Sequence, residues 1–346
     1  MLQNAFYLKS STLLLLLLAG VSVLFFCNLT FGSVPIPFRE VLTVLCGGEA
    51  SRSSWQFIVL QLRLPQAVTA LLCGASLAVS GLMLQTFFRN PLAGPSVLGI
   101  SQGASLGVAI VMLALGGTLG TGVATDTLSL PGGLSVVAGA FGGAVSITLL
   151  YLLLSRFVKS NLVLLILGIM VGYLTSSVVT LLNFFASVED VHSYVNWGMG
   201  SFGNVSPDRL PLLCAVSLMG ILLAVSQTKS LNALLLGEHY AVNLGMNLPR
   251  VRRVMLLSTG LLTAVTTAFC GPVSFIGLAV PHIARLMLGN ADHRVLLPAT
   301  LLTGGLVALL CNLICVMPTH IVIPLNAVTP LFGAPVIIYI ILKKRY

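Results

Sequence analysis

Residues 62–104 are LRLPQAVTALLCGASLAVSGLMLQTFFRNPLAGPSVLGISQGA, and this stretch predicts how the chain folds. It carries no charge between Arg63 and Arg89, and a helix of that length, rising about 1.5 Å per residue, crosses a hydrocarbon layer about 30 Å thick. The chain then breaks at Arg89-Asn90-Pro91 and continues as a second apolar segment. Small residues recur in the first helix: Gly74, Ala75, Ser76, Ala78, Ser80 and Gly81. Because small residues let helices approach closely in lipid, this helix is expected to pack against other helices.

The composition of the chain excludes a water-soluble globule. Hydrophobic residues make up 57% of it and charged residues only 7%, against about 25% in soluble domains. The sequence therefore predicts an all-α polytopic membrane protein in a lipid bilayer. The net charge of +9 does not indicate nucleic-acid binding, because the Lys and Arg residues separate apolar runs and do not gather on one polar face.

Apolar runs of about twenty residues predict about ten membrane spans in a single domain, residues 1–346. The first is the run Leu13–Phe26, because the small-residue cleavage site of a signal peptide does not follow it. Two spans fall in residues 62–104, and the next five end near Ser155, Ala186, Val225, Phe269 and Gly289, before two more between Val295 and Leu342. With both termini in the cytoplasm, most Lys and Arg residues lie on the cytoplasmic side, as the positive-inside rule requires.

Two similar segments predict an inverted repeat. GPSVLG (Gly94–Gly99) follows the second span, and GPVSFIG (Gly271–Gly277) follows the seventh. In the ten-span topology these segments are expected on opposite faces of the membrane, as in the inverted repeats of transporters.

The chain carries few groups that could do chemistry. Its seven cysteines include no CxxC pair and lie mostly in apolar segments, and its five histidines are scattered, so no metal site is predicted. It has no G-x-x-x-x-G-K-[ST] phosphate loop and no Ser/His/Asp order, so it is expected to hydrolyse no ATP, to bind no cofactor and not to be an enzyme.

The acidic residues weigh against an ion-coupled carrier. All eight of them lie in predicted loops or at span edges: Glu40, Glu49, Asp126, Glu189, Asp190, Asp208, Glu238 and Asp292. A carrier driven by ions normally buries a carboxylate inside the membrane. The energy for transport would then come from another subunit, or the protein would be passive.

Three long motifs resemble a known family. The stretch Leu62–Ala104, then GPVSFIGLAVPHIARLMLGNADHRVLLPATLLTGG (Gly271–Gly305), then TPLFGAPVIIYIIL (Thr329–Leu342) resemble the permease subunits of bacterial ABC importers for iron–siderophore complexes, haem and vitamin B12, the type II importers. The resemblance implies a transmembrane permease of the inner membrane that pairs with a second copy of itself, with two ATP-binding subunits and with a periplasmic substrate-binding protein. ATP and magnesium would then be held by the ATPase subunits.

The resemblance also implies an ATPase coupling site. The coupling loop of the family corresponds to residues 229–253, which we call the coupling loop, and the segment after it, PHIAR…DHR, resembles a joint near the ATPase. The residues carried over are Leu235, Gly237, Glu238, Ala241, Leu244, Gly245, Pro249, Arg250, His282, Arg285, Asp292 and Arg294. The alternatives are an ordinary connecting loop and a capped helix end.

Arg63 is implied as the contact for the binding protein, with membrane-interface snorkelling as the alternative. The chain departs from the family here, because Gln66 stands where the family has a second Arg and Cys315 where it often has a basic residue. For the translocation path or gate the candidates are Ser80, Gln85, Ser160 and Asn161, with hydrogen bonding between helices as the alternative.

The function expected from the resemblance is ATP-driven import by alternating access. The favoured cargo is an iron chelate, a siderophore or haem, with cobalamin next. The alternatives left open are a molybdate-type oxyanion as the cargo of the same permease, an ion-coupled secondary transporter and a membrane assembly factor.

Overall fold

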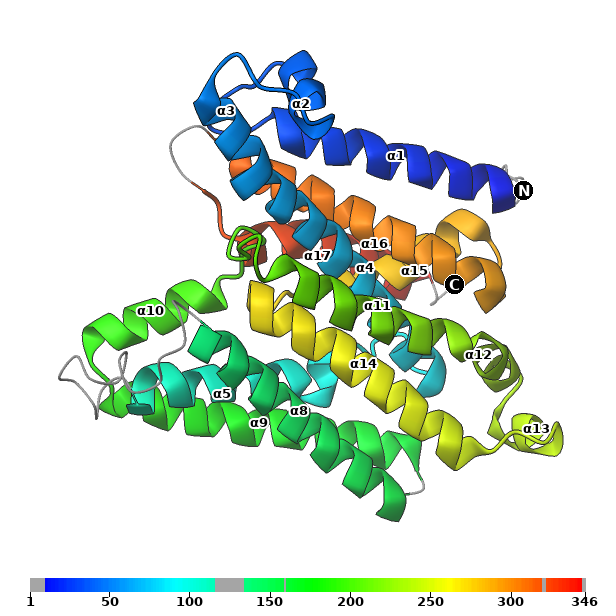
Figure 1. The fold of residues 1–346 in the computed structure, drawn as a ribbon. Helices are drawn as coiled ribbons and strands as arrows, with labels where there is room; N and C mark the ends of the chain where they lie inside the picture. Colours follow the sequence, from blue (N-terminus) through cyan, green and yellow to red (C-terminus); the bar gives the residue numbers. More distant parts are fainter. Residues whose placement is uncertain (1–9, 116–133, 159, 319–321, 344–346) are drawn as a thin grey trace.

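The computed structural model describes residues 10–115, 134–158, 160–318 and 322–343, and every regular element among them is helical (Figure 1). The first part holds α1 (Ser10–Thr30), α2 (Phe38–Leu45), α3 (Ser53–Phe57), the π-helix η1 (Ile58–Arg63), α4 (Leu64–Phe87), the short helix η2 (Pro95–Leu98), α5 (Ile100–Ala109), the π-helix η3 (Ile110–Leu115), α8 (Leu134–Phe157) and α9 (Asn161–Phe185). The second part holds α10 (Val188–Gly198), α11 (Leu210–Ser226), α12 (Thr228–Leu235), α13 (Glu238–Asn243), α14 (Leu248–Cys270), α15 (Ile276–Leu288), α16 (His293–Val316) and α17 (Leu325–Lys343).

The membrane spans agree with the predicted topology. In the described part of the chain, six helices are long and apolar enough to cross a membrane, and α11, which passes the same test only together with α12 across a bend of 48°, is counted as a seventh. Three shorter apolar helices, Ile100–Ala114, Ile276–Leu288 and Leu325–Tyr339, bring the number of membrane segments to the expected ten. The polar stretch after α1 folds into α2 and α3, and the mixed segment after α9 forms α10.

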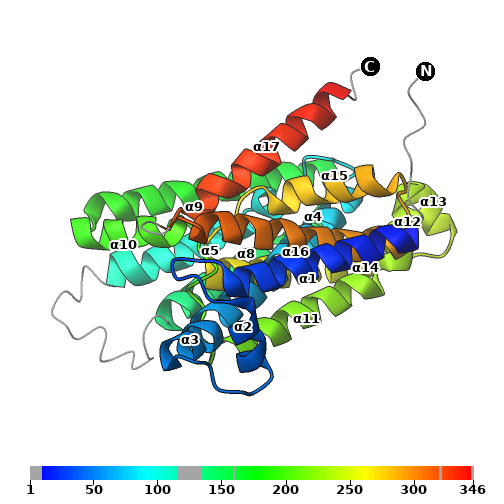
Figure 2. The ribbon, with the colours of Figure 1, turned by 90° about the horizontal axis from the view of Figure 1, so that it is seen from above.

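Helix α4 lies at the centre of the bundle. It packs against α16, α14, α15 and α11 (Figures 1 and 2). In the continuous helix Ser53–Phe87, of which α4 is the larger part, 83% of the most apolar stretch is buried, against 28% of the corresponding stretch in α1 and in α9. α17, in contrast, packs mainly against α15 and α16 and extends away from the bundle (Figure 2). The interior helix is therefore the one that the small-residue pattern predicted.

Glycines bring main chain against main chain where helices cross. A Cβ atom on Gly81 of α4 would overlap the carbonyl of Gly277 of α15, and one on Gly74 would overlap the carbonyl of Gly304 of α16. α5 and α8 cross in the same way, with two glycines four residues apart on each helix: Gly103, Gly107, Gly139 and Gly143. Side chains at these positions would force the helices apart, so the close packing depends on the absence of a Cβ.

The two repeated segments meet inside the bundle, which corrects the expectation that they lie on opposite faces. Pro95 packs against Gly277, and both segments line one cavity of about 170 Å³. They do enter from opposite ends: the first follows the cytoplasmic end of α4, and the second follows Cys270, which contacts Cys73 nearer the other end of α4. α15 is short and starts deep in the bundle, so its preceding loop reaches the first segment.

Candidate functional site

The coupling loop folds as two short helices at the cytoplasmic end of the bundle. Gly237 separates α12 from α13 with φ +110°, and Gly245 follows α13 with φ +84°; both values strongly favour glycine. One face of the loop is buried through Leu231, Leu234 and Ala241. The opposite face exposes large apolar side chains, which are Leu235, Leu236, Tyr240, Val242 and Leu244. An exposed apolar surface of this kind indicates a protein contact.

Asn232 attaches α12 to the bundle. Its Nδ2 donates to Asp292 Oδ1 (2.6 Å), and its Oδ1 accepts from the backbone N–H of His293 (2.8 Å) and lies 2.8 Å from His293 Nδ1. His293 is 1% exposed, and its Nε2 lies 2.9 Å from Thr86 Oγ1 on α4. We call Thr86, Asn232, Asp292 and His293 the Asn232 cluster. It connects the coupling loop to the starting turn of α16 and to the end of α4.

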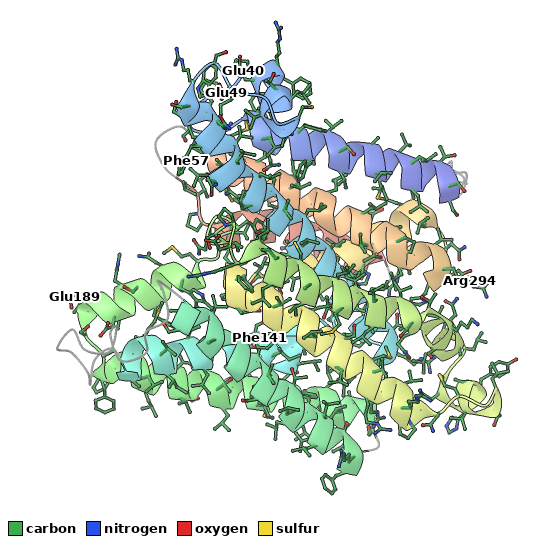
Figure 3. The ribbon with its side chains drawn as sticks, in the orientation of Figure 1. Glu40, Glu49, Phe57, Phe141, Glu189 and Arg294 are labelled. Carbon is green, nitrogen blue, oxygen red and sulfur yellow. The ribbon has the colours of Figure 1, made fainter. Side chains whose placement is uncertain are left out.

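Asp292 also caps the N-terminus of α16, as expected if this segment is a capped helix end. Its side chain accepts from the backbone N–H of Arg294 (2.9 Å), and this bond, with that from Asn232, holds the pKa of the Asp292 carboxyl below its ordinary value. Arg294 itself is exposed at the cytoplasmic end, far from Glu40, Glu49 and Glu189 at the other end (Figure 3).

Asn161 collects a second set of contacts at the start of α9. Its Nδ2 donates to the Glu238 carboxylate and to the carbonyl of Phe87 (3.2 Å), and its Oδ1 accepts from Arg252 Nη2 (2.9 Å). We call Phe87, Asn161, Glu238 and Arg252 the Asn161 cluster. Ser160, the neighbouring gate candidate, caps α9 by accepting from the N–H of Val163 (3.4 Å). A pocket of about 600 Å³ opens beside the cluster, lined by Ser155, Arg156, Val158, Glu238, Leu248, Pro249, Arg252 and Arg253.

The side chains of Arg285 and His282, in the segment predicted to contact the ATPase, make hydrogen bonds inside the bundle in this conformation. Arg285 Nη1 donates to Gln85 Oε1 (2.8 Å), and Gln85 Nε2 donates to the carbonyl of Leu278 (3.0 Å). His282 Nε2 lies 2.8 Å from the carbonyl of Pro91.

Pro249 and Arg250 lie in the first turn of α14, where the coupling loop ends. Pro249 lines the pocket beside the Asn161 cluster. Arg250 stays exposed, and its backbone N–H donates to Asn247 Oδ1 (3.1 Å), which caps the helix. The Arg250 side chain is therefore accessible at the cytoplasmic end, as a contact with an ATPase would require.

Two candidates for the path lie in helix contacts. Ser80 is fully buried, with its Oγ 3.3 Å from Thr263 Oγ1, and Gln85 connects α4 to α15 as described. In this conformation both side chains make hydrogen bonds between helices, which is the alternative to a role in the path. Whether Ser160 and Asn161 form a gate stays a prediction.

Arg63 is buried at the outer end. It is 7% exposed, its Nη1 donates to the carbonyls of Leu29 and Thr30 (both 2.9 Å), and its Nη2 donates to the carbonyl of Val34. In this structure the Arg63 guanidinium therefore holds the turn after α1, and its contact with a binding protein stays a prediction. This carbonyl cage, formed by residues about thirty positions earlier, gave no signal in the sequence.

Gln66 is also part of a polar chain between helices. Its Nε2 donates to Asn312 Oδ1 (3.0 Å), whose amide donates to Asn28 Oδ1 (2.8 Å). Gln66 and Cys315, the two positions that depart from the family pattern, line one cavity of about 170 Å³. Among the described residues no three His, Cys, Asp or Glu side chains gather as metal ligands would.

Replacing Arg63 by methionine is expected to lower the temperature of thermal inactivation by about 5 °C, because three carbonyls lose their donor while the apolar volume is kept. Thermal inactivation of the detergent-purified protein measures this, with Arg39→Met, an exposed arginine at the same end, as the control. Unchanged stability together with a lost contact to a binding protein would instead support the docking role.

Comparisons with known proteins agree with this architecture. The model of the FecCD transport family matches residues 17–343. The vitamin B12 import system permease protein BtuC of Klebsiella pneumoniae is 36% identical over 324 residues, covering 91% of this chain and 93% of that protein. The BtuC protein of Escherichia coli O9:H4 is 37% identical over 317 residues, covering 88% and 92%.

A solved structure agrees as well. It is described as an inward-facing conformation of a putative metal-chelate type ABC transporter, with a TM-score of 0.82 at 28% identity, covering 96% of this chain and 99% of that one. The chain therefore belongs to the FecCD transport family, as a multi-pass permease subunit of an ABC importer in the bacterial inner membrane, where separate subunits hydrolyse ATP.

Proposed function

We propose that this chain is the permease of an importer that moves vitamin B12, or a metal chelate of similar size, into the cytoplasm. The similarity over nearly the whole length to vitamin B12 permeases carries the choice of cargo. An iron chelate, siderophore or haem, is the second candidate, favoured by the likeness to a metal-chelate type transporter.

The described helices support an ATP-driven mechanism over an ion-coupled one. Acidic side chains in the described residues lie at helix ends and outside the spans, as Glu238 and Asp292 do. The exposed apolar face of the coupling loop offers a surface for an ATPase subunit, and its two glycine turns set the direction of that face. Movement of the docked ATPase subunits would then displace α13 and change access to the path.

A second copy of the chain is proposed to pack against α9 and α17. Both helices carry long exposed apolar faces at the edge of the molecule, formed by Met170, Tyr173, Leu174, Leu181 and Phe184 on α9 and by Leu331, Phe332, Ile338, Tyr339 and Leu342 on α17. The departure of α17 from the bundle leaves a face that a second copy can cover (Figure 2). The mass of the detergent-solubilised complex shows whether two copies associate, and cross-linking between cysteines introduced on α9 and α17 shows whether these helices form the contact.

Reconstitution tests the function. The permease is placed in liposomes with its ATPase subunit and with binding protein carrying cobalamin, iron–siderophore, haem or molybdate, and uptake and ATP hydrolysis are measured together. We expect cobalamin-loaded binding protein to stimulate both. Uptake that needs no ATPase subunit and follows an ion gradient would instead establish a secondary carrier.

The variant Gly245→Pro is expected to assemble and still hydrolyse ATP, but to lose at least about tenfold in uptake per ATP. Proline holds φ near −65°, whereas Gly245 has φ +84° and donates its N–H to the carbonyl of Val242 (2.9 Å). Gly245→Asn is the matched control, because asparagine tolerates positive φ. Wild-type uptake per ATP in both variants would show that the conformation of the turn at Gly245 is not needed for coupling.

A further inference from the structure

We propose that the hydrogen bond between Glu238 and Asn161 transmits movement of the coupling loop to the turn between α8 and α9, with Arg252 as the residue that positions Asn161 for it. The inference rests on the proposed function and names the contact through which that function couples ATP hydrolysis to the membrane helices. Glu238 then acts within this chain, in addition to any contact of its helix with an ATPase.

Within the Asn161 cluster, both the Nδ2 and the Oδ1 of the Asn161 side chain have hydrogen-bond partners. The two donors of Nδ2 are directed to the Glu238 carboxylate and the Phe87 carbonyl, while Oδ1 accepts from Arg252. Since Arg252 can only donate, it fixes which end of the amide is the oxygen and so points the Nδ2 donors at Glu238. Arg252 is therefore a positioning residue.

Arg252 is in turn held by the end of α8. It is 7% exposed, its Nη1 donates to the carbonyl of Val158 (2.8 Å), and its guanidinium lies 5.6 Å from the centre of the Phe87 ring. The last carbonyls of a helix carry partial negative charge, which suits a cation at this place. The turn between α8 and α9 is thus attached to α14 on one side and to α13 on the other.

The two clusters hold the two short helices of the coupling loop differently. Asn232 attaches α12 to α16 and, through His293, to the end of α4. Glu238 is the first residue of α13, and it attaches that helix to α9. Gly237 lies between the two attachments. A force on the exposed face of α13 can therefore turn α13 about Gly237 while α12 stays with the bundle, and the displacement reaches Asn161 directly.

Three variants test the proposal in the reconstituted importer with its ATPase and binding protein. Glu238→Ala and Asn161→Ala are each expected to lower uptake per ATP about ten- to a hundredfold, the range of one lost hydrogen bond to a charged group. Glu238→Gln keeps an oxygen that can accept from Asn161 Nδ2, so it is expected to recover most of the coupling. Glu189→Ala, an exposed glutamate on α10, is the control for removing a carboxylate.

The combination of variants separates coupling from simple folding. The double variant of Glu238 and Asn161 is expected to lose no more than the worse single variant, because both remove one contact. Wild-type coupling in Glu238→Ala, or equal losses in Glu238→Ala and Glu238→Gln, would overturn the proposal. Failure of Glu238→Ala to co-purify with the ATPase would also overturn it, by making Glu238 a docking residue.

A measurement without transport tests the Glu238–Asn161 contact separately from the proposed function. Spin labels at the exposed positions Leu162→Cys and His239→Cys, with the native cysteines replaced, report the distance between α9 and α13 in the permease alone. A narrow distance distribution that broadens when Asn161→Ala is added supports the contact, and one that does not change overturns it. Failure of the wild type to import any cargo, with this result intact, would count against the proposed function only.

Discussion

The variant Gly81→Ala is expected to abolish the folded permease. A Cβ at Gly81 would overlap the main chain of Gly277, with the Gly277 Cα itself only 3.0 Å away. Because the clash is with backbone and no side chain can move aside, α15 would have to leave the centre of the bundle. We expect a loss of stability of at least about 3 kcal/mol, the upper part of the range for overpacked cores, and little monodisperse protein in detergent.

The control for this variant is Gly142→Ala on α8, where no atom outside the adjoining turns of its own helix backbone lies within 4 Å of the added Cβ. Alanine there gains about 1 kcal/mol of helix propensity over glycine, so this variant is expected to be as stable as the wild type or more so. Size-exclusion profiles and thermal inactivation of both variants decide the matter. Similar profiles for the two would mean that the crossing of α4 and α15 is looser than described.

The variant Asn232→Leu is expected to detach α12 from the bundle. Leucine keeps the volume but loses the bond to the Asp292 carboxylate and leaves His293, which is 1% exposed, without its partner on Nδ1. Leaving such groups unpaired costs about 3 kcal/mol. We expect the ATPase subunit to bind this variant at least about tenfold more weakly, because the exposed face of the coupling loop no longer has a fixed position.

Co-purification and ATPase titration measure this loss. Asn204→Leu, an exposed asparagine outside both clusters, is the control. Full ATPase affinity in Asn232→Leu would show that α12 holds its place through the buried Leu231 and Leu234 alone.

The parts of the fold that could be predicted are those that repeat along the chain. The uncharged run after Arg63 and its small residues predicted the central helix α4, and the spacing of charges predicted the topology. Glycine turns of the coupling loop were also visible, because positive φ leaves a residue preference that a sequence displays.

The partners of polar side chains could not be predicted, because they lie far away in sequence. Arg63 carried the signal of a charged residue at a membrane edge, yet its partners are backbone carbonyls, which any residue supplies. Asn232 was missed altogether, since a single asparagine on a short helix looks like an ordinary exposed residue. Its partner His293 lies 61 residues further along the chain, and Thr86, whose hydroxyl contacts His293, lies 207 residues before His293.

The glycine crossings divide the molecule into parts that can and cannot rearrange. Helices that interleave side chains can slide by changing rotamers, but α4 meets α15 and α16 through main chain, where sliding would bring carbonyl oxygens into contact. We therefore expect these three helices to keep one arrangement throughout the transport cycle. Two conformations of this permease superposed on α4, α15 and α16 should coincide there, with their differences confined to the helices that carry less buried surface, such as α9 and α17.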